Sequence, residues 1–427
     1  MGAREPIAVI GTGYVGLVTA VGFAELGSEV WCVDVDAEKI AGLKRGEVPI
    51  YEPGVAEALA RNRERLHFST ELTETLERAR LLFVAVGTPP TYSGDADLSA
   101  VNAVVNAMPA SDSHALVMKS TVPVGTGAAI RRILAEQGKE QFAYVSCPEF
   151  LKEGSALEDF LAPDRVVVGD EGDWAGDATV ELYSPLQAPL VRTDIPSAEM
   201  IKLAANAFLA TKISFINEIA NVCEETGADV LEVARGMGLD HRIGTHFLKP
   251  GIGFGGSCFP KDVSALKQLA GNSGYHFQLL TAVIEVNELQ KRRVIAKLQK
   301  HLGSLVGKRV ALLGLAFKAN TDDMREASSL VLAARLQADG AKVSAYDPVA
   351  EDAARTMMVG VQFADSALEA LEGADACIIV TEWPEFRDLD WEAARDSMRR
   401  PLVVDGRNFL DADAAKAAGL VYEGIGR

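Results

Sequence analysis

One stretch near the middle of the chain combines residue types that point to covalent chemistry. Residues 249–262 read Lys-Pro-Gly-Ile-Gly-Phe-Gly-Gly-Ser-Cys-Phe-Pro-Lys-Asp, so four glycines lead to a single cysteine, Cys258. Glycines let backbone lie against a ligand without obstruction from Cβ atoms. A thiol beside Lys261 and a helix start has the surroundings that favour a reactive thiolate. A loop with a buried structural cysteine is the competing interpretation. The concentration of glycines, Cys258, Lys261 and Asp262 in one short stretch disfavours it. We predict a helix over 263–270 with Asp262 as its N-cap.

Two further pairs of polar residues have spacings that suit catalysis. Glu149 and Glu153 follow a short predicted strand and share one face only if their stretch is helical. Their spacing fits proton transfer and a solvated helix start equally well. Lys202 and Asn206 stand one turn apart beside the apolar stripe of a long predicted helix. Without further information, an ordinary surface pair is the default interpretation.

The amino-terminal segment has the pattern of a dinucleotide-binding turn. An apolar strand at 7–10 leads into Gly11-Thr-Gly-Tyr-Val-Gly, an apolar helix, and a second strand that ends at Asp34. Gly11 permits the tight turn, Gly13 lets backbone approach a pyrophosphate, and Gly16 lets the helix pack on the sheet. The helix start favours the pyrophosphate charge. Since the Asp34 carboxylate would bind ribose hydroxyls and repel a 2′-phosphate, we predict NAD rather than NADP.

Composition limits the partners and the compartment. The 427 residues include 42 Lys and Arg against 60 Asp and Glu, a net charge of −18 that argues against nucleic acid and anionic membranes. The five cysteines lack CxxC or histidine spacing, so we predict neither disulfides nor a metal site, and a cytoplasmic protein. Residues 7–24 are uncharged, but glycines interrupt them, which favours strand, loop and helix over a membrane segment.

The element pattern predicts an α/β protein with two Rossmann-like parallel-sheet domains joined by a helical central domain with a long helix. We place the domains at 1–196, 197–302 and 303–427. Long helices at 197–226 and 278–302 make the central block a reasonable dimerisation region. The last third of the chain repeats the alternation of strands and helices of the first third, but it lacks the GxGxxG turn. It carries Lys318, Arg325 and Arg407 at strand ends, which suggests a nucleotide site of another kind.

Taken together, the motifs resemble the UDP-glucose/GDP-mannose dehydrogenase family over essentially the whole chain. They are GTGYVG at 11–16, STVPVGT at 120–126, PEFLKEG at 148–154, Lys202 with Asn206, GFGGSCFPKD at 253–262, FKANTDDMRE at 317–326 and DGR at 405–407. The resemblance implies oxidation of a sugar C6 alcohol to a carboxylate in two steps with two NAD, no metal, and at least a dimer. UDP-glucose, giving UDP-glucuronate, is the expected substrate; GDP-mannose or a UDP-N-acetylhexosamine is the alternative. Uronate supply for polysaccharide biosynthesis follows by resemblance only.

The resemblance also implies residue roles. Cys258 matches the nucleophile, and the polar set around the reacting carbon and its water matches Lys202, Asp262, Asn206, Glu149, Glu153 and Thr121. Arg242 matches an arginine that reaches into the neighbouring subunit. The other sugar-nucleotide contacts match Phe150, Leu151, Lys152, Lys249, Phe254, Gly255, Lys318 and Arg407, with Lys152 where many relatives have Arg. Cofactor positions match Gly11, Gly13, Tyr14, Val15, Gly16, Asp34, Lys39, Thr88, Thr121, Glu153, Lys261 and Arg325.

The cysteine distinguishes this chemistry from its rivals. An aldehyde yields no second hydride until a nucleophile adds, and the Cys258 thiolate would form a thiohemiacetal that is oxidised to a thioester and hydrolysed by water. A one-step hydroxyacid dehydrogenase has no need of Cys258. A regulatory NAD-binding protein with a vestigial site is disfavoured by the intact Cys258, Lys202, Asn206 and Asp262.

Overall fold

The computed structural model describes residues 4–92 and 94–427, and the chain divides into two compact units. The first unit contains the residues up to Ala205 together with Ser264–Tyr275. The second contains Asn206–Val263 and His276–Arg427. Two helices, α9 (Ile195–Thr226) and α11 (Phe259–Asn272), each pass from one unit into the other.

The first unit is built on an eight-stranded sheet with the order β3-β2-β1-β4-β5-β6-β7-β8. Neighbouring strands are parallel except for β6 and β7, which are antiparallel. The strand order reverses between β1 and β4, so the crevice at their carboxyl ends is the expected ligand position in such a sheet. The strands are β1 (Ile7–Ile10), β2 (Val30–Val33), β3 (Leu66–Ser69), β4 (Leu81–Val84), β5 (Ala115–Met118), β6 (Ala143–Ser146), β7 (Val166–Gly169) and β8 (Leu190–Thr193).

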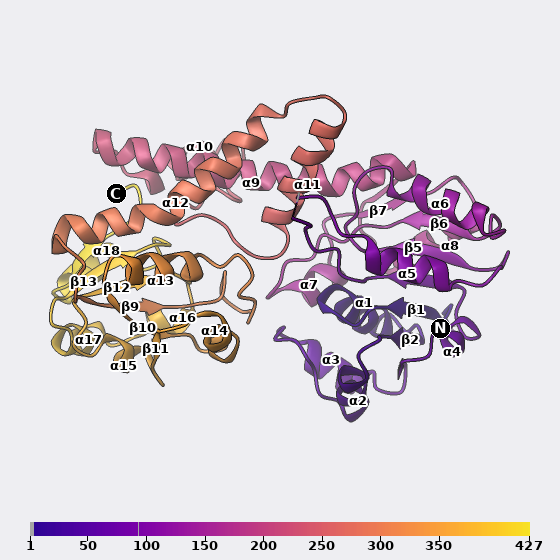
Figure 1. The fold of residues 1–427 in the computed structure, drawn as a ribbon, viewed down its shortest axis with the longest axis horizontal. Coiled ribbons are helices and arrows are strands. Elements are labelled where there is room, and N and C mark those ends of the chain that lie inside the picture. Colours follow the sequence, from indigo (N-terminus) through magenta and orange to yellow (C-terminus); the bar gives the residue numbers. More distant parts are fainter. Residues whose placement is uncertain (1–3, 93) are drawn as a thin grey trace. The chain divides into compact units, whose positions relative to one another are not determined.

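Helices cover both faces of this sheet (Figure 1). Ile7 and Val9 pack into one hydrophobic cluster, whereas Ala8 and Ile10 pack into another on the opposite face. Burial on both faces explains why these strands are unbroken apolar runs. The helices of this unit are α1 (Tyr14–Glu25), α2 (Ala37–Arg45), α3 (Val55–Arg61), α4 (Leu72–Leu76), α5 (Ser99–Ala107), α6 (Thr126–Glu136), α7 (Ala156–Leu161) and α8 (Trp174–Tyr183), with a 3₁₀ turn at Ser184–Leu186.

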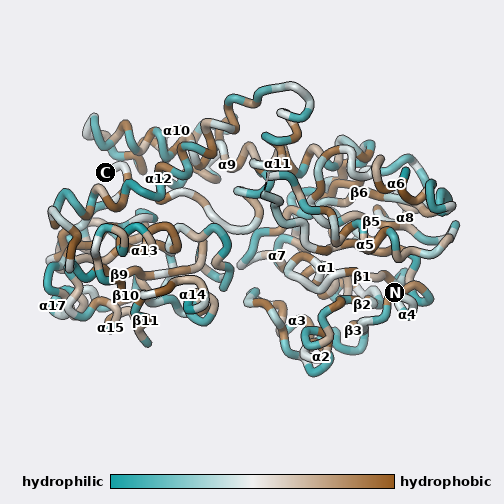
Figure 2. Tube along the Cα trace, viewed as in Figure 1, coloured by the Kyte–Doolittle hydropathy of each residue, from teal (hydrophilic) through white to brown (hydrophobic). Residues whose placement is uncertain are grey.

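The second unit has a six-stranded parallel sheet with the order β11-β10-β9-β12-β13-β14. Its strands are β9 (Arg309–Leu313), β10 (Lys342–Tyr346), β11 (Gln362–Phe363), β12 (Ala376–Ile379), β13 (Leu402–Asp405) and β14 (Val421–Glu423). Figure 2 shows hydrophobic residues concentrated along the strands of both sheets. The predicted fold class, two Rossmann-like parallel sheets with a helical region, is confirmed.

Residues from α9 and α12 (Gln278–Leu302) pack with one face of this second sheet. Val310 and Leu312 of β9 belong to that cluster, and Ala311 and Leu313 belong to the cluster on the other face. The remaining helices are α10 (Val230–Gly238), α13 (Ser328–Ala338), α14 (Glu351–Met357), α15 (Ala367–Leu371), α16 (Pro384–Arg387), α17 (Trp391–Ser397) and α18 (Ala412–Ala417). The three domain bounds drawn from the sequence stay a prediction.

The turn after β9 differs from the turn after β1 in a way that explains the missing GxGxxG. Asp347, at the end of β10, accepts the N–H groups of Leu315 at 2.6 Å and Ala316 at 3.1 Å. The next helix begins only at Ser328. Since Asp34 likewise accepts the Thr12 N–H in the turn after β1, the difference lies in the helix: α1 begins at Tyr14, whereas no helix N-terminus follows the turn after β9 directly.

Candidate active site

The glycine-rich turn of the first unit has the shape that a pyrophosphate requires. Gly11 has φ +94°, and a Cβ there would lie 2.7 Å from the Ala85 carbonyl oxygen. A Cβ on Gly16 would lie 1.8 Å from the Gly11 carbonyl oxygen, so only glycine fits. At Gly13, beside the first residue of α1, no heavy atom lies within 4 Å of the Cβ position. The open space at a helix N-terminus fits the phosphates of a dinucleotide.

Asp34 lies at the end of β2 with its carboxylate beside this turn. Its Oδ2 accepts the Thr12 N–H at 2.8 Å and the Thr12 hydroxyl at 2.7 Å, and Lys39 Nζ lies 3.3 Å away. Burial raises the pKa of Asp34, but the hydrogen bonds from Thr12 and Asp36 and the charge of Lys39 outweigh it and leave the pKa below its ordinary value. The group is therefore a carboxylate at neutral pH, as the predicted ribose contact requires.

The loops after β4 and β5 bring two predicted cofactor residues together. The Thr88 hydroxyl donates to the Thr121 carbonyl oxygen at 2.8 Å. Both residues follow strands at the carboxyl edge of the sheet, where ligands of such sheets bind.

Tyr14 and Val15, at the start of α1, both pack against the hydrophobic cluster on one face of the sheet. The Tyr14 hydroxyl also donates to the Glu52 carboxylate. Glu52 also accepts the N–H groups of Gly154 at 2.6 Å and Ala156 at 2.7 Å, so it ties the nucleotide turn to the loop that carries Glu153. The sequence analysis missed Glu52, which stands in a loop without periodic signal.

Burial and the acidic groups near Tyr14 make its phenol harder to ionise. Burial, the hydrogen bond to Glu52, and the charges of Glu52 and then Glu153 raise the pKa of Tyr14 well above its ordinary value. The phenol therefore stays protonated and remains a donor to Glu52.

The 148–154 loop is not helical, so Glu149 and Glu153 do not share a helix face. Glu149 is buried instead, with Oε1 2.8 Å from Lys202 Nζ and Oε2 accepting the Leu151 N–H at 2.6 Å. Burial raises the pKa of Glu149, but the charge and hydrogen bond of Lys202, helped by Leu151 and Lys119, outweigh it and lower the pKa below its ordinary value. The loop thus presents a buried Glu–Lys ion pair.

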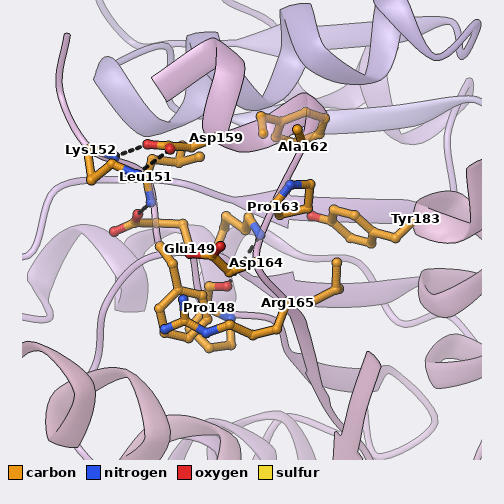
Figure 3. Close-up of a pocket in the computed structure, with 14 residues that line it drawn as sticks. Pro148, Glu149, Leu151, Lys152, Asp159, Ala162, Pro163, Asp164, Arg165 and Tyr183 are labelled. Carbon is orange, nitrogen blue, oxygen red and sulfur yellow. Dashed lines mark hydrogen bonds and ion pairs between the residues drawn. The ribbon is translucent and has the colours of Figure 1, made fainter. Parts of the chain in front are cut away.

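The neighbouring loop residues line a cavity of about 100 Å³. The guanidinium carbon of Arg165 lies 3.6 Å from the Phe150 ring centre, and Lys152 pairs with Asp159. Figure 3 shows the Lys152–Asp159 pair beside Leu151, and Arg165 near Pro148 on another part of the cavity lining.

Two charged residues of the first unit were missed by the sequence analysis. Lys119 is buried, with Nζ 3.5 Å from the Pro148 carbonyl oxygen, and directly precedes the STVPVGT motif. Glu199 accepts the N–H groups of Gly125 at 2.7 Å and Gly127 at 2.8 Å, which holds the turn before α6. Its spacing of three residues from Lys202 on α9 was the available signal.

In the second unit, Cys258 precedes the first residue of α11. The predicted helix start at 263 with Asp262 as N-cap is wrong, because α11 begins at Phe259 and the Asp262 N–H donates to the Cys258 carbonyl at 2.8 Å. Pro260 fits the first turn, where its missing N–H costs nothing. Cys258 is partly exposed, whereas the other four cysteines are buried.

Asp262 lies in the first turn of α11, and its carboxylate contacts other side chains. It is buried, with Oδ2 accepting Asn206 Nδ2 at 2.6 Å and Oδ1 accepting Lys261 Nζ at 2.7 Å. Asn206 and Lys202 are four residues apart on α9, so one helix carries the partners of both Asp262 and Glu149.

Other predicted substrate residues in the second unit surround the cysteine loop, residues 249–258. Lys249 is exposed, Phe254 is buried with its ring centre 5.7 Å from that of Phe259, and a Cβ on Gly255 would lie 2.2 Å from the Glu326 carbonyl oxygen. Arg407 donates to the Gly253 carbonyl oxygen at 3.0 Å.

The remaining predicted cations lie near rings or acids of their own segments. Lys318 Nζ lies 5.5 Å from the Phe317 ring centre. Arg325 pairs with Asp323 and Arg242 with Asp240, with guanidinium–carboxylate distances of 2.7 and 2.6 Å. Across residues 4–92 and 94–427, we find neither a cluster of three or more His, Cys, Asp or Glu that could hold a metal nor a helix able to span a membrane.

Family models match the chain in three consecutive segments. The NAD binding domain of the UDP-glucose/GDP-mannose dehydrogenase family matches residues 5–187, its central domain residues 196–289, and its UDP binding domain residues 311–412.

Similar proteins cover nearly the whole chain. UDP-glucose 6-dehydrogenase TuaD of Bacillus subtilis is 47% identical over 99% of this chain and 93% of its own length. A UDP-glucose 6-dehydrogenase of Pseudomonas aeruginosa is 48% identical over 99% of this chain and 97% of its own. The structure of a UDP-glucose dehydrogenase from Pyrobaculum islandicum aligns with a TM-score of 0.92 at 40% identity, covering 100% of this chain and 98% of that one.

Proposed function

The chain belongs to the UDP-glucose/GDP-mannose dehydrogenase family and is an NAD-dependent oxidoreductase, and from this premise we propose that it oxidises UDP-glucose to UDP-glucuronate. The observation that carries the proposal is the pair of buried contacts made from α9, Lys202 with Glu149 and Asn206 with Asp262. Such polar groups are costly to bury, so their presence one helical turn apart favours a catalytic purpose.

The first unit supplies the cofactor site. We assign the pyrophosphate to the turn at Gly11, Gly13 and Gly16, and the ribose hydroxyls to Asp34. Bound NAD would accept the hydride in each of the two oxidations. Thr88, Thr121 and Glu153 stand at the sheet edge that faces such a ligand, and Lys261 and Arg325 are assigned from the family pattern.

In the first oxidation the C6 carbon would lose a hydride to NAD and the C6 hydroxyl would lose its proton, which leaves an aldehyde. The proton goes to a basic group or an ordered water, for which the carboxylates of Glu149 and Asp262 are the assigned candidates. The Glu149–Lys202 pair also fixes the Lys202 ammonium, which then stabilises negative charge on the C6 oxygen.

In the second oxidation the Cys258 thiolate adds to the aldehyde carbon, forming a C–S bond and placing the electron pair on oxygen. Lys202 and Asn206 are assigned as donors to that oxyanion. Loss of the second hydride leaves a thioester. Water, activated by Asp262 or Glu153, adds to its carbonyl, the C–S bond breaks, and the carboxylate leaves with the thiolate restored.

The sugar nucleotide is assigned to the 148–153 loop, the cysteine loop, Lys318 and Arg407. A homodimer, with Arg242 completing the neighbouring site, is proposed for the assembly. GDP-mannose or a UDP-N-acetylhexosamine remains the alternative substrate, since a UDP-D-ManNAc dehydrogenase of Pyrococcus horikoshii has the same fold at a TM-score of 0.86 and 29% identity. The higher identity of the UDP-glucose enzymes favours UDP-glucose.

The test is to count the NADH formed per sugar nucleotide with UDP-glucose, GDP-mannose and UDP-N-acetylglucosamine at limiting concentration. Two NADH per UDP-glucose, with UDP-glucuronate as product, is the expected result. One NADH per sugar, or turnover of another sugar nucleotide in preference, would contradict the proposal.

A further inference from the structure

Two residues of the cysteine loop have both of their backbone groups held by side-chain amides. Asn287 of α12 accepts the Phe254 N–H through Oδ1 at 2.7 Å and donates from Nδ2 to the Phe254 carbonyl oxygen at 3.0 Å. At Gly251, Asn217 of α9 accepts the N–H at 2.8 Å, and Gln290 of α12 donates to the carbonyl oxygen at 3.0 Å. The amides therefore supply one donor and one acceptor to each residue, as a neighbouring strand would.

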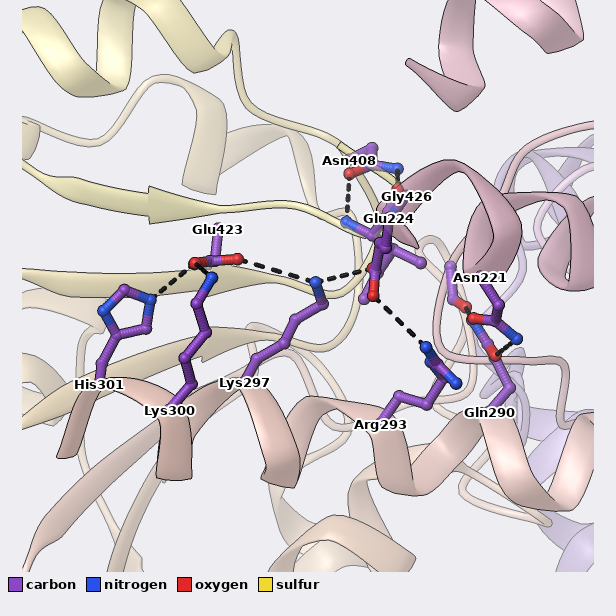
Figure 4. Close-up of polar contacts among 12 residues, drawn as sticks. Asn221, Glu224, Gln290, Arg293, Lys297, Lys300, His301, Asn408, Glu423 and Gly426 are labelled. Carbon is purple, nitrogen blue, oxygen red and sulfur yellow. Dashed lines mark hydrogen bonds and ion pairs between the residues drawn. The ribbon is translucent and has the colours of Figure 1, made fainter. Parts of the chain in front are cut away.

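These amides are buried, and their purpose is visible in what they contact. Asn217, Asn287 and Gln290 are 0%, 3% and 1% exposed. Burying an amide is costly unless it is hydrogen-bonded, and each of the three forms a hydrogen bond with the loop backbone. Asn221 Nδ2 donates to Gln290 Oε1 at 3.2 Å, which turns the Gln290 Nε2 toward Gly251; Figure 4 shows this pair.

Gly253, between the two held residues, fits the same arrangement. It has φ +88°, and a Cβ there would lie 2.7 Å from Asn287 Oδ1. A side chain at this position would therefore both strain the backbone and push Asn287 away from the loop.

Neutral amides suit this task better than charged groups. A carboxylate has no donor for the Phe254 and Gly251 carbonyls, and a lysine has no acceptor for their N–H groups. A carboxylate fixed against the loop would also disfavour the thiolate form of Cys258 by like-charge repulsion. Amides hold the backbone without adding charge near the nucleophile.

We propose that Asn287, Gln290 and Asn217 are positioning residues that act through the loop backbone to set where Cys258 attacks. The inference rests on the proposed function, because only a reaction that passes through a covalent thioester needs the Cys258 thiolate held at a fixed position relative to the aldehyde carbon. The second oxidation depends on this placement and the first does not. A small displacement of a reacting group is enough to cost about a hundredfold in rate.

The test compares Asn287→Ala, Asn287→Asp and Gln290→Glu with wild type. The Asp and Glu variants keep side-chain shape and remove the donor to a loop carbonyl. Asn62→Ala removes a buried amide from the first unit, and Gln299→Ala removes an exposed amide from α12, so both serve as controls. The measurements are NADH per UDP-glucose, kcat, KM for NAD, hydroxylamine-trapped aldehyde, and the pH profile of Cys258 alkylation by iodoacetamide.

We call the amides that hold the loop backbone the clamp, and Asn287→Ala, Asn287→Asp and Gln290→Glu the clamp variants. We expect the clamp variants to lose about 10-fold to 100-fold in kcat, with KM for NAD within about twofold of wild type. NADH per UDP-glucose should fall from two toward one as aldehyde is trapped, and the alkylation profile should change. The controls should keep two NADH and the wild-type profile. A substitution that only lowered stability would leave both NADH per UDP-glucose and the pH profile of Cys258 alkylation at their wild-type values.

Folded clamp variants with wild-type stoichiometry and wild-type alkylation would overturn the inference. If Asn287→Ala fails to fold by circular dichroism, the two shape-preserving variants decide the outcome. Failure of the proposed function appears separately, as a wild-type protein that makes no NADH from UDP-glucose. Alkylation needs no turnover, so a profile that differs between wild type and Asn287→Ala, which introduces no charge, would support the clamp even then.

Discussion

Among single residues, Cys258 is the one whose removal should separate the two oxidations. Cys258→Ala should still transfer the first hydride, because alcohol oxidation needs only a positioned C6 and a proton acceptor. It should stop there, because a free aldehyde offers no hydride until a nucleophile adds. We expect slow NADH formation at no more than one per UDP-glucose, with an aldehyde that hydroxylamine traps.

Cys223→Ala is the matched control, since it removes a buried thiol from the core of the second unit. It should lower the midpoint of thermal unfolding and keep two NADH per UDP-glucose. A folded Cys258→Ala enzyme that made UDP-glucuronate near the wild-type rate would rule out the covalent route.

Asp34 should set the choice between NAD and NADP. Because its carboxylate stays ionised beside the nucleotide turn, wild type should prefer NAD strongly over NADP. Asp34→Ala should reduce the difference in kcat/KM between NAD and NADP and should raise KM for NAD about tenfold. Initial rates over both cofactors measure this. Glu38→Ala, which removes an exposed acid four residues away in sequence, should leave the preference intact. Equal use of NADP by wild type would make the ribose assignment wrong.

For whole elements, the sequence predicted long helices and buried strands, although the buried interior strand β7 was missed. The strand at 7–10 and the helix at 278–302 lie where the pattern placed them. Interior strands of a covered sheet are unbroken apolar runs, which are easy to recognise. Edge strands were missed: β8 is largely exposed, and β11 has two residues. Neither has a continuous apolar signal.

The sequence predicted which residues belong to the candidate site, but it did not predict which of them form hydrogen bonds with one another. Spacing of four residues placed Lys202 and Asn206 on one helix face. Their partners Glu149 and Asp262 lie 53 and 56 positions away in the chain, beyond any local rule. The helix start at Phe259 was missed because Asp262 has good N-cap chemistry, yet its carboxylate is committed to Asn206 and Lys261.

An ion-pair network joins three elements of the second unit, α9, α12 and β14 (Figure 4). Lys297 Nζ lies 2.7 Å from Glu224 and 3.7 Å from Glu423, and Lys300 and His301 also contact Glu423. Burial raises the pKa of both glutamates, but the hydrogen bonds and charges of these cations outweigh it and lower the pKa below the ordinary 4.5. A lowered carboxylate pKa contributes stability above pH 4.5 that is lost as the pH falls through the folded-state value.

Lys297→Met should therefore lower the midpoint of thermal unfolding at pH 7, because it leaves two partly buried carboxylates without their shared cation. The difference from wild type should shrink as the pH falls through the lowered pKa values of the two glutamates, where the carboxylates become protonated. Lys342→Met, at an exposed position on β10, is the control and should change little. A difference that stayed constant from pH 3 to pH 7 would assign the loss to packing.

For the whole molecule, Arg242 tests whether active sites are shared between subunits. Its side chain is 78% exposed and pairs with Asp240 two positions before it. If it completes a neighbouring sugar site, Arg242→Ala should raise KM for UDP-glucose about tenfold and leave KM for NAD unchanged. Arg235→Ala, which breaks an exposed pair with Glu232 on α10, is the matched control.

Mixing supplies the second half of that test. Co-refolded Arg242→Ala and Cys258→Ala chains should regain activity, because one of the two shared sites would receive a wild-type arginine and a wild-type cysteine. Mixed dimers without any recovery would count against a shared site.

The passage of α9 and α11 between units constrains how this chain could exchange parts with relatives. The first unit is interrupted in the sequence by Asn206–Val263 and completed by Ser264–Tyr275, so a single crossover anywhere in the gene leaves at least one unit of mixed parentage. In a chimaera joined at Ala205, the first unit would take its sheet from one parent and residues Ser264–Tyr275 from the other. Intact units can be inherited only when two segments are exchanged together, so recombination should favour replacing the whole gene over swapping its halves.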